Sequence, residues 1–431
     1  MTLFGMFFGA GNLIFPVHLG QLAGNNYLMA TIGFIITAVS IPILAVAAIG
    51  ITHSNGLMAL SSKVSKKFAY FFTCLLYLTI GPLFAIPRCA TTSYTIGIAP
   101  FFNEDKALYL LIFSLIFFAL VLYFSLKPSG ITIWIGKIIN PIFLIFLFIL
   151  IIFALKDNNA SLSTVQPIDT YMGNSLFNGF IEGYGTMDAI AGLAFGIVVI
   201  NIIKQMGIKE DKDVASEVIK SGVITGLLMA FIYILTIIIG AKSRNMFDIS
   251  ANGGIALAQI ANYYLKSFGS IVLCITITFA CLKTSIGLVT SCAETFEGLF
   301  KGFSYKTWAI IFTLFSFIIS NFGLNSIITY SIPVLMFIYP IAITLTLLAL
   351  FSKKFKDAKE VYLCTISFTI FAAIFDLIKA LPFDLIQKLN LQIFIDLATT
   401  YFPFYNLGLG FVAPSIIGLC LGLYLRKRRL I

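Results

Sequence analysis

Two glycines, an asparagine and a proline interrupt the first apolar stretch of this chain, at a spacing that could expose peptide groups for binding. The stretch spans residues 3–22 and contains Gly9, Gly11, Asn12 and Pro16. In a helix interior, glycine costs about 1 kcal/mol relative to alanine, and proline costs about 3 kcal/mol. A helix broken here leaves N–H and C=O groups that the bilayer interior cannot solvate, so they must line a cavity and bind a ligand. A kinked helix that packs through its glycines is the alternative.

A second glycine-rich interruption lies in the sixth apolar stretch, at residues 176–203. It contains Gly183, Gly185 and Asp188. The sixth stretch follows the first by five segments, which is an odd number, so a second set of five segments would enter the membrane from the opposite side. Paired interruptions in two inverted halves are the best sequence indication of a transporter site.

The composition places both stretches in an integral membrane protein. Of the 431 residues 59% are hydrophobic and 11% are charged, with a mean hydropathy of +1.01; soluble domains carry about 25% charged residues. The net charge of +10 does not predict nucleic-acid binding, because the basic residues lie between apolar segments and not on one arm. The seven cysteines show neither metal-ligand spacing nor a pairing pattern, and we expect them to be small buried side chains.

We predict an all-α membrane domain over residues 1–431 with about twelve transmembrane helices, the first and sixth of them broken. Lys and Arg concentrate in alternate loops, which places both termini in the cytoplasm. One long outer connection, at 242–266, contains an expected interfacial helix after a turn near Asn252. The inverted repeats would span about 3–155 and 176–351, followed by extra helices at about 361–425. The expected segments are about 3–22, 27–52, 68–96, 107–125, 130–155, 176–203, 217–241, 267–296, 307–320, 327–351, 361–378 and 400–425.

Four motifs resemble the branched-chain amino acid:cation symporters (the LIVCS family), and they occur in the family's order. They are FFGAGNLIFP at 7–16, GPLFAIPR at 81–88, GYGTMD at 183–188 and ACLKTSIGL at 280–288. The resemblance covers nearly the whole chain. It implies a bacterial cytoplasmic-membrane protein of the LeuT-type fold, with a 5+5 inverted repeat, that takes up leucine, isoleucine and valine. Family members usually carry a further short stretch before the first motif, so we expect either a misassigned start or a shortened form.

The implied substrate is a zwitterion, and the two interruptions offer groups for both of its charges. Amide groups at the start of a half-helix suit a carboxylate, and glycine allows the backbone to approach closely. Carbonyl groups of an unwound sixth segment suit the ammonium. The candidate substrate-binding residues are Gly9, Ala10, Gly11, Asn12, Tyr184, Gly185 and Thr186.

The resemblance to the LeuT-type fold also implies a sodium site. Thr284 and Ser285 would join carbonyl groups of Gly5, Phe8 and Cys281 around the ion. The alternative for the two hydroxyl groups is hydrogen bonding back to their own helix. No other metal and no cofactor is expected.

Four charged residues inside apolar segments are candidates for coupling or gating. An ammonium at the depth of Lys283 costs several kcal/mol unless it is paired or neutral. The Lys283 side chain would therefore pair with a carboxylate, extend to an aqueous vestibule or exchange a proton. Sodium coupling is the main expectation and proton coupling through Lys283 is the alternative. Lys137 is a second proton-site candidate, with snorkelling to the interface as its alternative. Arg88 is a candidate outer gate or an interfacial anchor, and Asp188 is a functional carboxylate or a structural one.

A secondary symporter explains these features better than a channel or a membrane enzyme does. A channel would need a pore-lining ring or filter. An enzyme would need a metal cluster or a catalytic pair, which two isolated histidines do not provide. No nucleotide-binding loop is present, so an ion gradient would supply the energy.

Overall fold

The chain is built from α-helices joined by short turns, and no strand occurs in the part of the chain that is described. The computed structural model describes residues 2–52, 54, 56–102, 106–126, 131–156, 161–205, 207–208 and 211–429. These residues form two compact units. Unit 1 comprises Met1–Phe34, Leu78–Glu182 and Met229–Ile328, and unit 2 comprises Ile35–Tyr77, Gly183–Leu228 and Thr329–Ile431.

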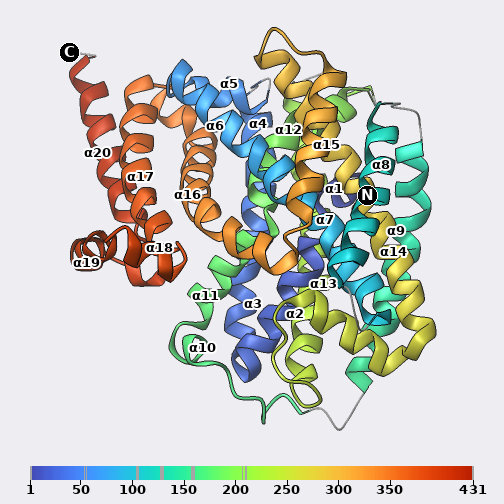
Figure 1. Ribbon diagram of the computed structural model, residues 1–431. Helices are drawn as coiled ribbons and strands as arrows, with labels where there is room; N and C mark the ends of the chain where they lie inside the picture. The colour runs from blue at the N-terminus through green and yellow to red at the C-terminus, as the bar shows by residue number, and fades with distance from the viewer. Residues whose placement is uncertain are drawn as a thin grey trace. The chain divides into compact units, whose positions relative to one another are not determined.

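Unit 1 contains the first interruption and the long α14. Figure 1 labels its helices. Its elements are α1 (Thr2–Phe7), α2 (Gly11–Ala23), α3 (Tyr27–Ile35), η3 (Thr79–Leu83), α7 (Ala85–Ser93), η4 (Tyr94–Ile98), α8 (Lys106–Leu126), α9 (Ile131–Lys156), α10 (Asp169–Gly173), α11 (Ser175–Glu182), the second part of α13 (Asp211–Ser243), α14 (Gly253–Leu299) and α15 (Tyr305–Ser320).

Unit 2 contains the sixth-segment interruption and the C-terminal helices. In Figure 1, α17 and α20 run side by side, joined through α18 and α19. Its elements are η2 (Ile36–Ser40), α4 (Ile41–Ile51), α5 (Leu57–Ser62), α6 (Lys66–Leu78), η6 (Gly183–Thr186), α12 (Asp188–Gln205), the first part of α13, most of α16 (Leu324–Leu350), α17 (Lys359–Lys379), α18 (Phe383–Lys388), α19 (Gln392–Tyr401), η8 (Tyr405–Leu407) and α20 (Val412–Arg429).

Seven helical segments of the described chain are long and apolar enough to cross a membrane, which agrees with the expected class. Two shorter apolar helices, Leu144–Lys156 and Tyr305–Ser320, accompany them, and twelve spans stay a prediction. The seven are Gly11–Ile51, Lys66–Phe101, Ala107–Leu126, Ser216–Ser243, Gly269–Leu299, Leu324–Leu350 and Lys359–Lys379.

Most expected segments match the helices within a few residues, but the last one was wrong. We placed it at 400–425, whereas α20 begins at Val412 and a separate α19 ends at Tyr401. The apolar character of residues 400–411 belongs to a turn that contains Phe404 and Gly408, both with positive φ. The helix expected near Asn252 is confirmed: the Asn252 side chain accepts hydrogen bonds from the first amides of α14, and a kink at Lys266 separates this first part from the long span.

Glycines allow α2 and α13 of unit 1 to touch through their backbones. A Cβ atom on Gly20 would lie 2.0 Å from the carbonyl oxygen of Ile237, and one on Gly240 would lie 2.1 Å from that of Val17. Glycine at these positions is therefore required by the close approach of the two helices. This contact holds α2, which begins at the first interruption, against α13.

Cysteines contribute to another contact in unit 1, between α14 and the helical stretch at residues 79–98. Cys274 and Cys292 lie opposite Gly97 and Gly81, where an added Cβ atom would come within 2.6 Å of each sulfur. Three cysteines, Cys89, Cys281 and Cys292, are buried as expected, but Cys420 is exposed. The expectation thus holds for these three cysteines, is met in part by the half-buried Cys74, Cys274 and Cys364, and fails for Cys420 on α20.

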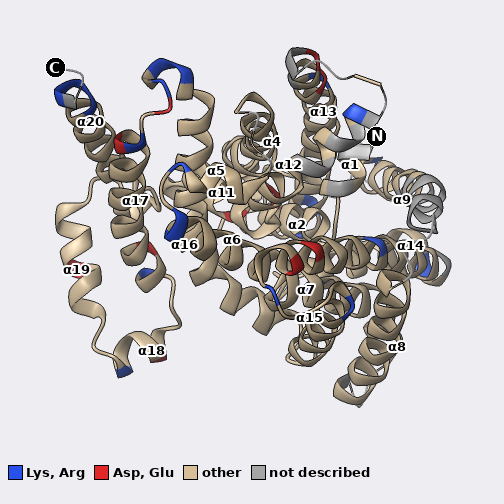
Figure 2. Ribbon diagram, turned by 90° about the horizontal axis from the view of Figure 1, so that it is seen from above, with Lys and Arg blue, Asp and Glu red and all other residues tan. Residues whose placement is uncertain are grey.

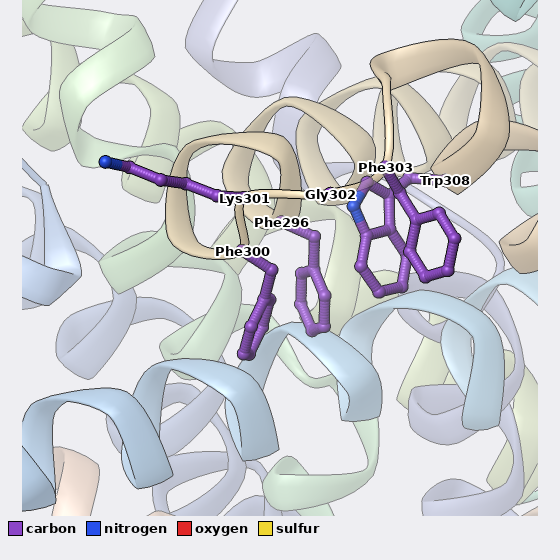
Figure 3. A pocket seen from close by; sticks show the side chains of 6 residues that line it. All are labelled: Phe296, Phe300, Lys301, Gly302, Phe303 and Trp308. Carbon is purple, nitrogen blue, oxygen red and sulfur yellow. The ribbon is translucent and has the colours of Figure 1, made fainter.

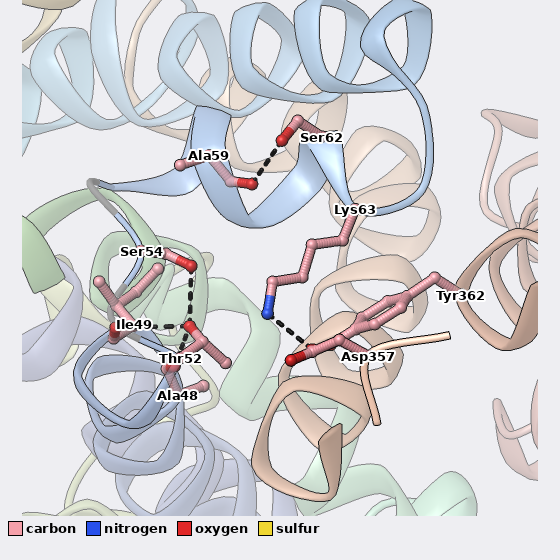
Figure 4. Close-up of polar contacts among 9 residues, drawn as sticks. All are labelled: Ala48, Ile49, Thr52, Ser54, Ala59, Ser62, Lys63, Asp357 and Tyr362. Atoms are coloured by element: carbon pink, nitrogen blue, oxygen red, sulfur yellow. Dashed lines mark hydrogen bonds and ion pairs between the residues drawn. The ribbon is translucent and has the colours of Figure 1, made fainter. Parts of the chain in front are cut away.

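Basic residues gather at one end of unit 2, as the loop pattern predicts. Figure 2 shows them at the end of α20 and in the turn that precedes α17. Lys63 forms an ion pair with Asp357 at 2.7 Å (Figure 4), and the Arg426 guanidinium donates to the carbonyl oxygen of Lys354. Loops that are far apart in the sequence therefore share one end of this unit.

Candidate functional site

The first interruption is held open by the side chain of Asn12. Helix α1 ends at Phe7 and α2 begins at Gly11. The Gly9 amide donates to Asn12 Oδ1 at 2.9 Å, and Asn12 Nδ2 donates to the Tyr233 hydroxyl on α13. One buried amide group thus satisfies a backbone donor of the break and ties the break to a neighbouring helix. Gly9 is among the predicted substrate-binding residues, and its amide is already used in this arrangement.

Helix α14 lies against the interruption at Lys283 and Thr284. A Cβ atom on Gly9 would lie 3.5 Å from Thr284 Cγ2 and 3.7 Å from Thr284 Oγ1. The Lys283 ammonium donates to the carbonyl oxygen of Gly5, with 3.3 Å between the two atoms. The break is therefore accompanied by a cation and a hydroxyl group from the same turn of α14.

The residues of the expected sodium site all belong to unit 1, but they are used in different ways. Thr284 Oγ1 donates to the carbonyl oxygen of Ala280 in its own helix, which was the alternative for this residue. Ser285 is buried, and its hydroxyl group lies beside the Cys89 thiol. Phe8 and Cys281 are buried, and the Gly5 carbonyl accepts the Lys283 ammonium.

The sixth segment changes its backbone conformation between Glu182 and Asp188. Helix α11 ends at Glu182, η6 covers Gly183–Thr186, and Met187 has a φ of 65° before α12 begins at Asp188. Thr186 Oγ1 donates to the Gly183 carbonyl at 2.9 Å and accepts from the Asp188 amide at 3.3 Å. The local polar groups thus stabilise the turn in which the helix axis is interrupted.

Aromatic stacking fixes Tyr184 within unit 2. Its ring stacks on Tyr339 of α16, with 4.1 Å between the ring centroids, and both side chains are buried. Asp188 is buried as well, and it is the first residue of α12, where a carboxylate is favoured by the helix dipole.

The predicted substrate residues are divided between the two units. Gly9, Ala10, Gly11 and Asn12 belong to unit 1, and Tyr184, Gly185 and Thr186 belong to unit 2. The two groups form two separate backbone interruptions, each with its own supporting contacts.

The other two charged candidates are Arg88 and Lys137. Arg88 on α7 is 3% exposed, and its guanidinium lies 5.2 Å from the centre of the Phe15 ring, an arrangement with cation–π character. Arg88 therefore packs against α2 of unit 1. Lys137 lies in α9, and its side chain is outside the described residues.

An apolar pocket in unit 1 lies away from the predicted site residues. It occupies the turn between α14 and α15 and has a volume of about 450 Å³ (Figure 3). Aromatic rings with a lysine beside them are typical of residues at a membrane interface. The pocket is lined by Phe296, Phe300, Lys301, Gly302, Phe303 and Trp308.

Sequence reasoning missed two features of this region. Tyr233 supports the first interruption from 221 residues away, and its apolar segment gave no sign of that role. Asp376 on α17 is 1% exposed, and neither of its carboxylate oxygens has a hydrogen-bond partner among the described residues. Its place near the end of an apolar segment, beside Lys379, resembles an ordinary helix terminus.

Comparisons with known sequences find relatives that match nearly the whole length of the chain. Residues 1–429 match the family described as "Branched-chain amino acid transport protein". The branched-chain amino acid permease BrnQ of Lactobacillus delbrueckii subsp. lactis is 49% identical over 419 residues, which cover 96% of this chain and 93% of that protein. The branched-chain amino acid permease BraB of Bacillus subtilis is 43% identical over 421 residues, covering 97% and 93%.

Solved structures of the transporter Mhp1 share the fold of this chain. Mhp1 of the nucleobase-cation-symport-1 family, closed with bromovinylhydantoin bound, aligns with a TM-score of 0.59 at 14% identity, covering 99% of this chain and 91% of that one. Its inward-facing conformation aligns with a TM-score of 0.58 at 12% identity, covering 100% and 90%. This likeness establishes the LeuT-type fold that was expected from the motifs.

Proposed function

The chain belongs to the family of branched-chain amino acid transport proteins, and we propose that it is a cation-coupled symporter that takes up leucine, isoleucine and valine. Its membrane would be the bacterial cytoplasmic membrane, with both termini in the cytoplasm. The observation that carries the proposal is the interrupted helix at Phe8–Ala10, which adjoins α14 at Lys283 and Thr284. The helix start at Gly11 presents backbone donors of the kind that bind carboxylates.

The substrate half of the proposal assigns the two charges of the amino acid to the two interruptions. The amides of Ala10, Gly11 and Asn12 would receive the carboxylate, and carbonyl groups of Gly183–Thr186 would receive the ammonium. Opposite faces of the protein would open in turn to these groups. The Asn12 side chain would keep the first interruption in its binding shape, because it already bonds to Gly9 and Tyr233.

For the coupling ion, the contacts around the first interruption support a proton carried by Lys283. The Gly5 carbonyl, which a sodium ion would need, accepts the Lys283 ammonium, and Thr284 Oγ1 donates within its own helix. A fixed ammonium beside these ligands would repel a sodium ion, because two unit charges 4 Å apart interact by about 4 kcal/mol at an effective dielectric constant of 20. Loss of the proton would weaken the hydrogen bond to the Gly5 carbonyl, because a neutral amine is a poorer donor than an ammonium, and would let the interruption rearrange.

Sodium is the second candidate ion, and Ser285 is the observation that favours it. Its hydroxyl group is buried beside the Cys89 thiol and makes no hydrogen bond to the described backbone of its own helix, and hydroxyl oxygens are hard ligands that suit sodium. In this alternative the flexible Lys283 side chain would leave Gly5 when sodium binds.

Reconstitution into liposomes tests both halves of the proposal. Counterflow of labelled leucine should be inhibited by unlabelled isoleucine and valine but not by lysine or glutamate; inhibition by the charged amino acids would contradict the substrate assignment. Leucine should also accumulate in sodium-free vesicles when a pH gradient is imposed, acidic on the entry side. Accumulation that needs sodium and ignores the pH gradient would establish the second candidate instead.

A further inference from the structure

Asp376 is a buried carboxyl group that has no role in the transport cycle proposed above. It lies in α17, three residues before that membrane-spanning helix ends at Lys379, and it is 1% exposed. Both carboxylate oxygens are enclosed without a hydrogen-bond partner within the described residues. An ionisable side chain inside a membrane span is expected to have a function, because burying it is costly.

The described groups named here around Asp376 belong to unit 2, and one of them is the cation Lys379. Lys379 lies one turn farther along α17. Its ammonium donates to the carbonyl oxygen of Tyr405 at 3.1 Å and lies 4.7 Å from the centre of the Tyr405 ring. The Tyr405 hydroxyl in turn donates to the carbonyl oxygen of Phe375. The lysine is therefore engaged by η8 and makes no hydrogen bond to the carboxyl group.

Two further contacts define the space around the carboxyl group. A Cβ atom on Gly410 would lie 3.2 Å from Asp376 Oδ1 and 2.7 Å from the Tyr405 ring, so glycine is needed here to admit the carboxyl group. Tyr184 of η6 and its stacking partner Tyr339 complete the titratable surroundings, and Tyr184 and Tyr405 both lie close enough to interact electrostatically with Asp376. The carboxyl group thus neighbours the interruption of the sixth segment.

A carboxylate in this position cannot remain ionised without compensation. Protein interiors stabilise a charged carboxylate by hydrogen-bond donors or by a directly paired cation. Among the described residues Asp376 has no hydrogen-bond donor, and Lys379 acts on it only from a distance while bonded to Tyr405. A neutral carboxylic acid costs much less to bury here than a carboxylate does, whereas an alkali cation would require several more oxygen ligands directed at the same point.

We propose that Asp376 is a proton-binding site, protonated in the conformation described here. It gives up the proton when η6 or η8 rearranges and Lys379 turns from Tyr405 to the carboxylate. The proton passes from the Asp376 carboxyl group to water, and the resulting carboxylate pairs with the Lys379 ammonium. This inference rests on the proposed symport, to which it adds a second proton site in unit 2, linked through Tyr184 to the substrate-binding backbone.

Infrared spectroscopy of the purified full-length chain reads the protonation state directly, whether or not the protein transports. The carbonyl stretch of a protonated carboxyl group should be present in the wild type and lost in Asp376→Asn. The band should be unchanged in the control Asp384→Asn, since Asp384 is exposed on α18. Asp376→Glu, which keeps a carboxyl group, should shift the band, so the test survives if the asparagine variant does not fold.

Transport gives the second readout and separates this inference from the proposed function. Asp376→Asn should retain leucine counterflow, which needs no net proton movement, and lose accumulation driven by a pH gradient. An infrared spectrum that is the same in wild type, Asp376→Asn and Asp376→Glu would overturn the assignment of a bound proton. Undiminished accumulation by the asparagine variant would overturn its role in coupling. Failure of the wild type to exchange any leucine would instead contradict the proposed function, and the infrared result would stand by itself.

Discussion

The Lys283 ammonium lies 3.3 Å from the carbonyl oxygen of Gly5 and donates a hydrogen bond to it. Lys283 belongs to α14 and Gly5 to the short helix α1, so this contact joins the first interruption to the helix that carries Thr284 and Ser285. The charge on one side chain can therefore control whether α1 stays attached to α14. This contact is the physical basis on which we propose a proton as the coupling ion.

Removing the Asn12 side chain should weaken the first interruption. In Asn12→Ala the Gly9 amide and the Tyr233 hydroxyl each lose a hydrogen bond, and a buried backbone donor left unsatisfied costs about 1–3 kcal/mol. We expect a lower melting temperature in detergent and a higher KM for leucine. A double-mutant cycle with Tyr233→Phe should be non-additive, because the two side chains share one hydrogen bond. Fully additive effects would contradict the bridge.

Adding one methyl group at Gly240 should disrupt the contact between α2 and α13. The new Cβ atom would lie 2.1 Å from the carbonyl oxygen of Val17, and forced overpacking costs typically about 1–3 kcal/mol. Thermal unfolding followed by size-exclusion chromatography should show the loss. Gly287→Ala on α14 is the matched control, since an added Cβ atom there meets nothing within 4 Å. Equal stability of the two variants would argue against backbone contact between α2 and α13.

Lys242 should contribute to stability by capping α9. Its ammonium donates to the carbonyl oxygens of Ala154 and Leu155 at 3.1 Å and 3.0 Å, near the end of that helix. Hydrogen bonds to charged groups contribute about 1.5–3 kcal/mol, so Lys242→Met should lower the apparent melting temperature. Lys220→Met, which removes an exposed pair with Glu217, should leave it unchanged. If Lys242→Met melts at the same temperature as the wild type, Lys242 does not stabilise the protein by capping α9.

The helices of the fold could be predicted from the sequence because membrane spans are set by local composition. Long apolar stretches located α8, α15 and α17 within a few residues, and an asparagine followed by two glycines located the start of α14. Residues 400–411 were misread because a hydrophobic turn and a hydrophobic helix have the same composition. Only positive φ angles at Phe404 and Gly408 reveal the turn.

The supporting contacts of the site could not be predicted in this way. Gly9 and Asn12 stand out locally, but Tyr233 becomes their partner only when α13 packs on α2 through Gly20 and Gly240. Asp376 likewise resembles a surface carboxylate at a helix end, yet it is buried where Tyr405 of η8 and Gly410 pack beside it. Such partners depend on packing between distant segments, which a single sequence does not encode by spacing.

The most direct measurement is leucine-driven proton movement in sodium-free liposomes, with a pH-sensitive dye trapped inside. Adding leucine outside should acidify the interior of vesicles that contain the wild type. Vesicles that contain Lys283→Met should exchange leucine by counterflow without acidification, because coupling requires the proton on Lys283 even when Asp376 is intact. Thr284→Ala should acidify the interior as the wild type does. Acidification that persists in Lys283→Met, or that appears in no variant until sodium is added, would contradict the assignment of Lys283 as the coupling residue.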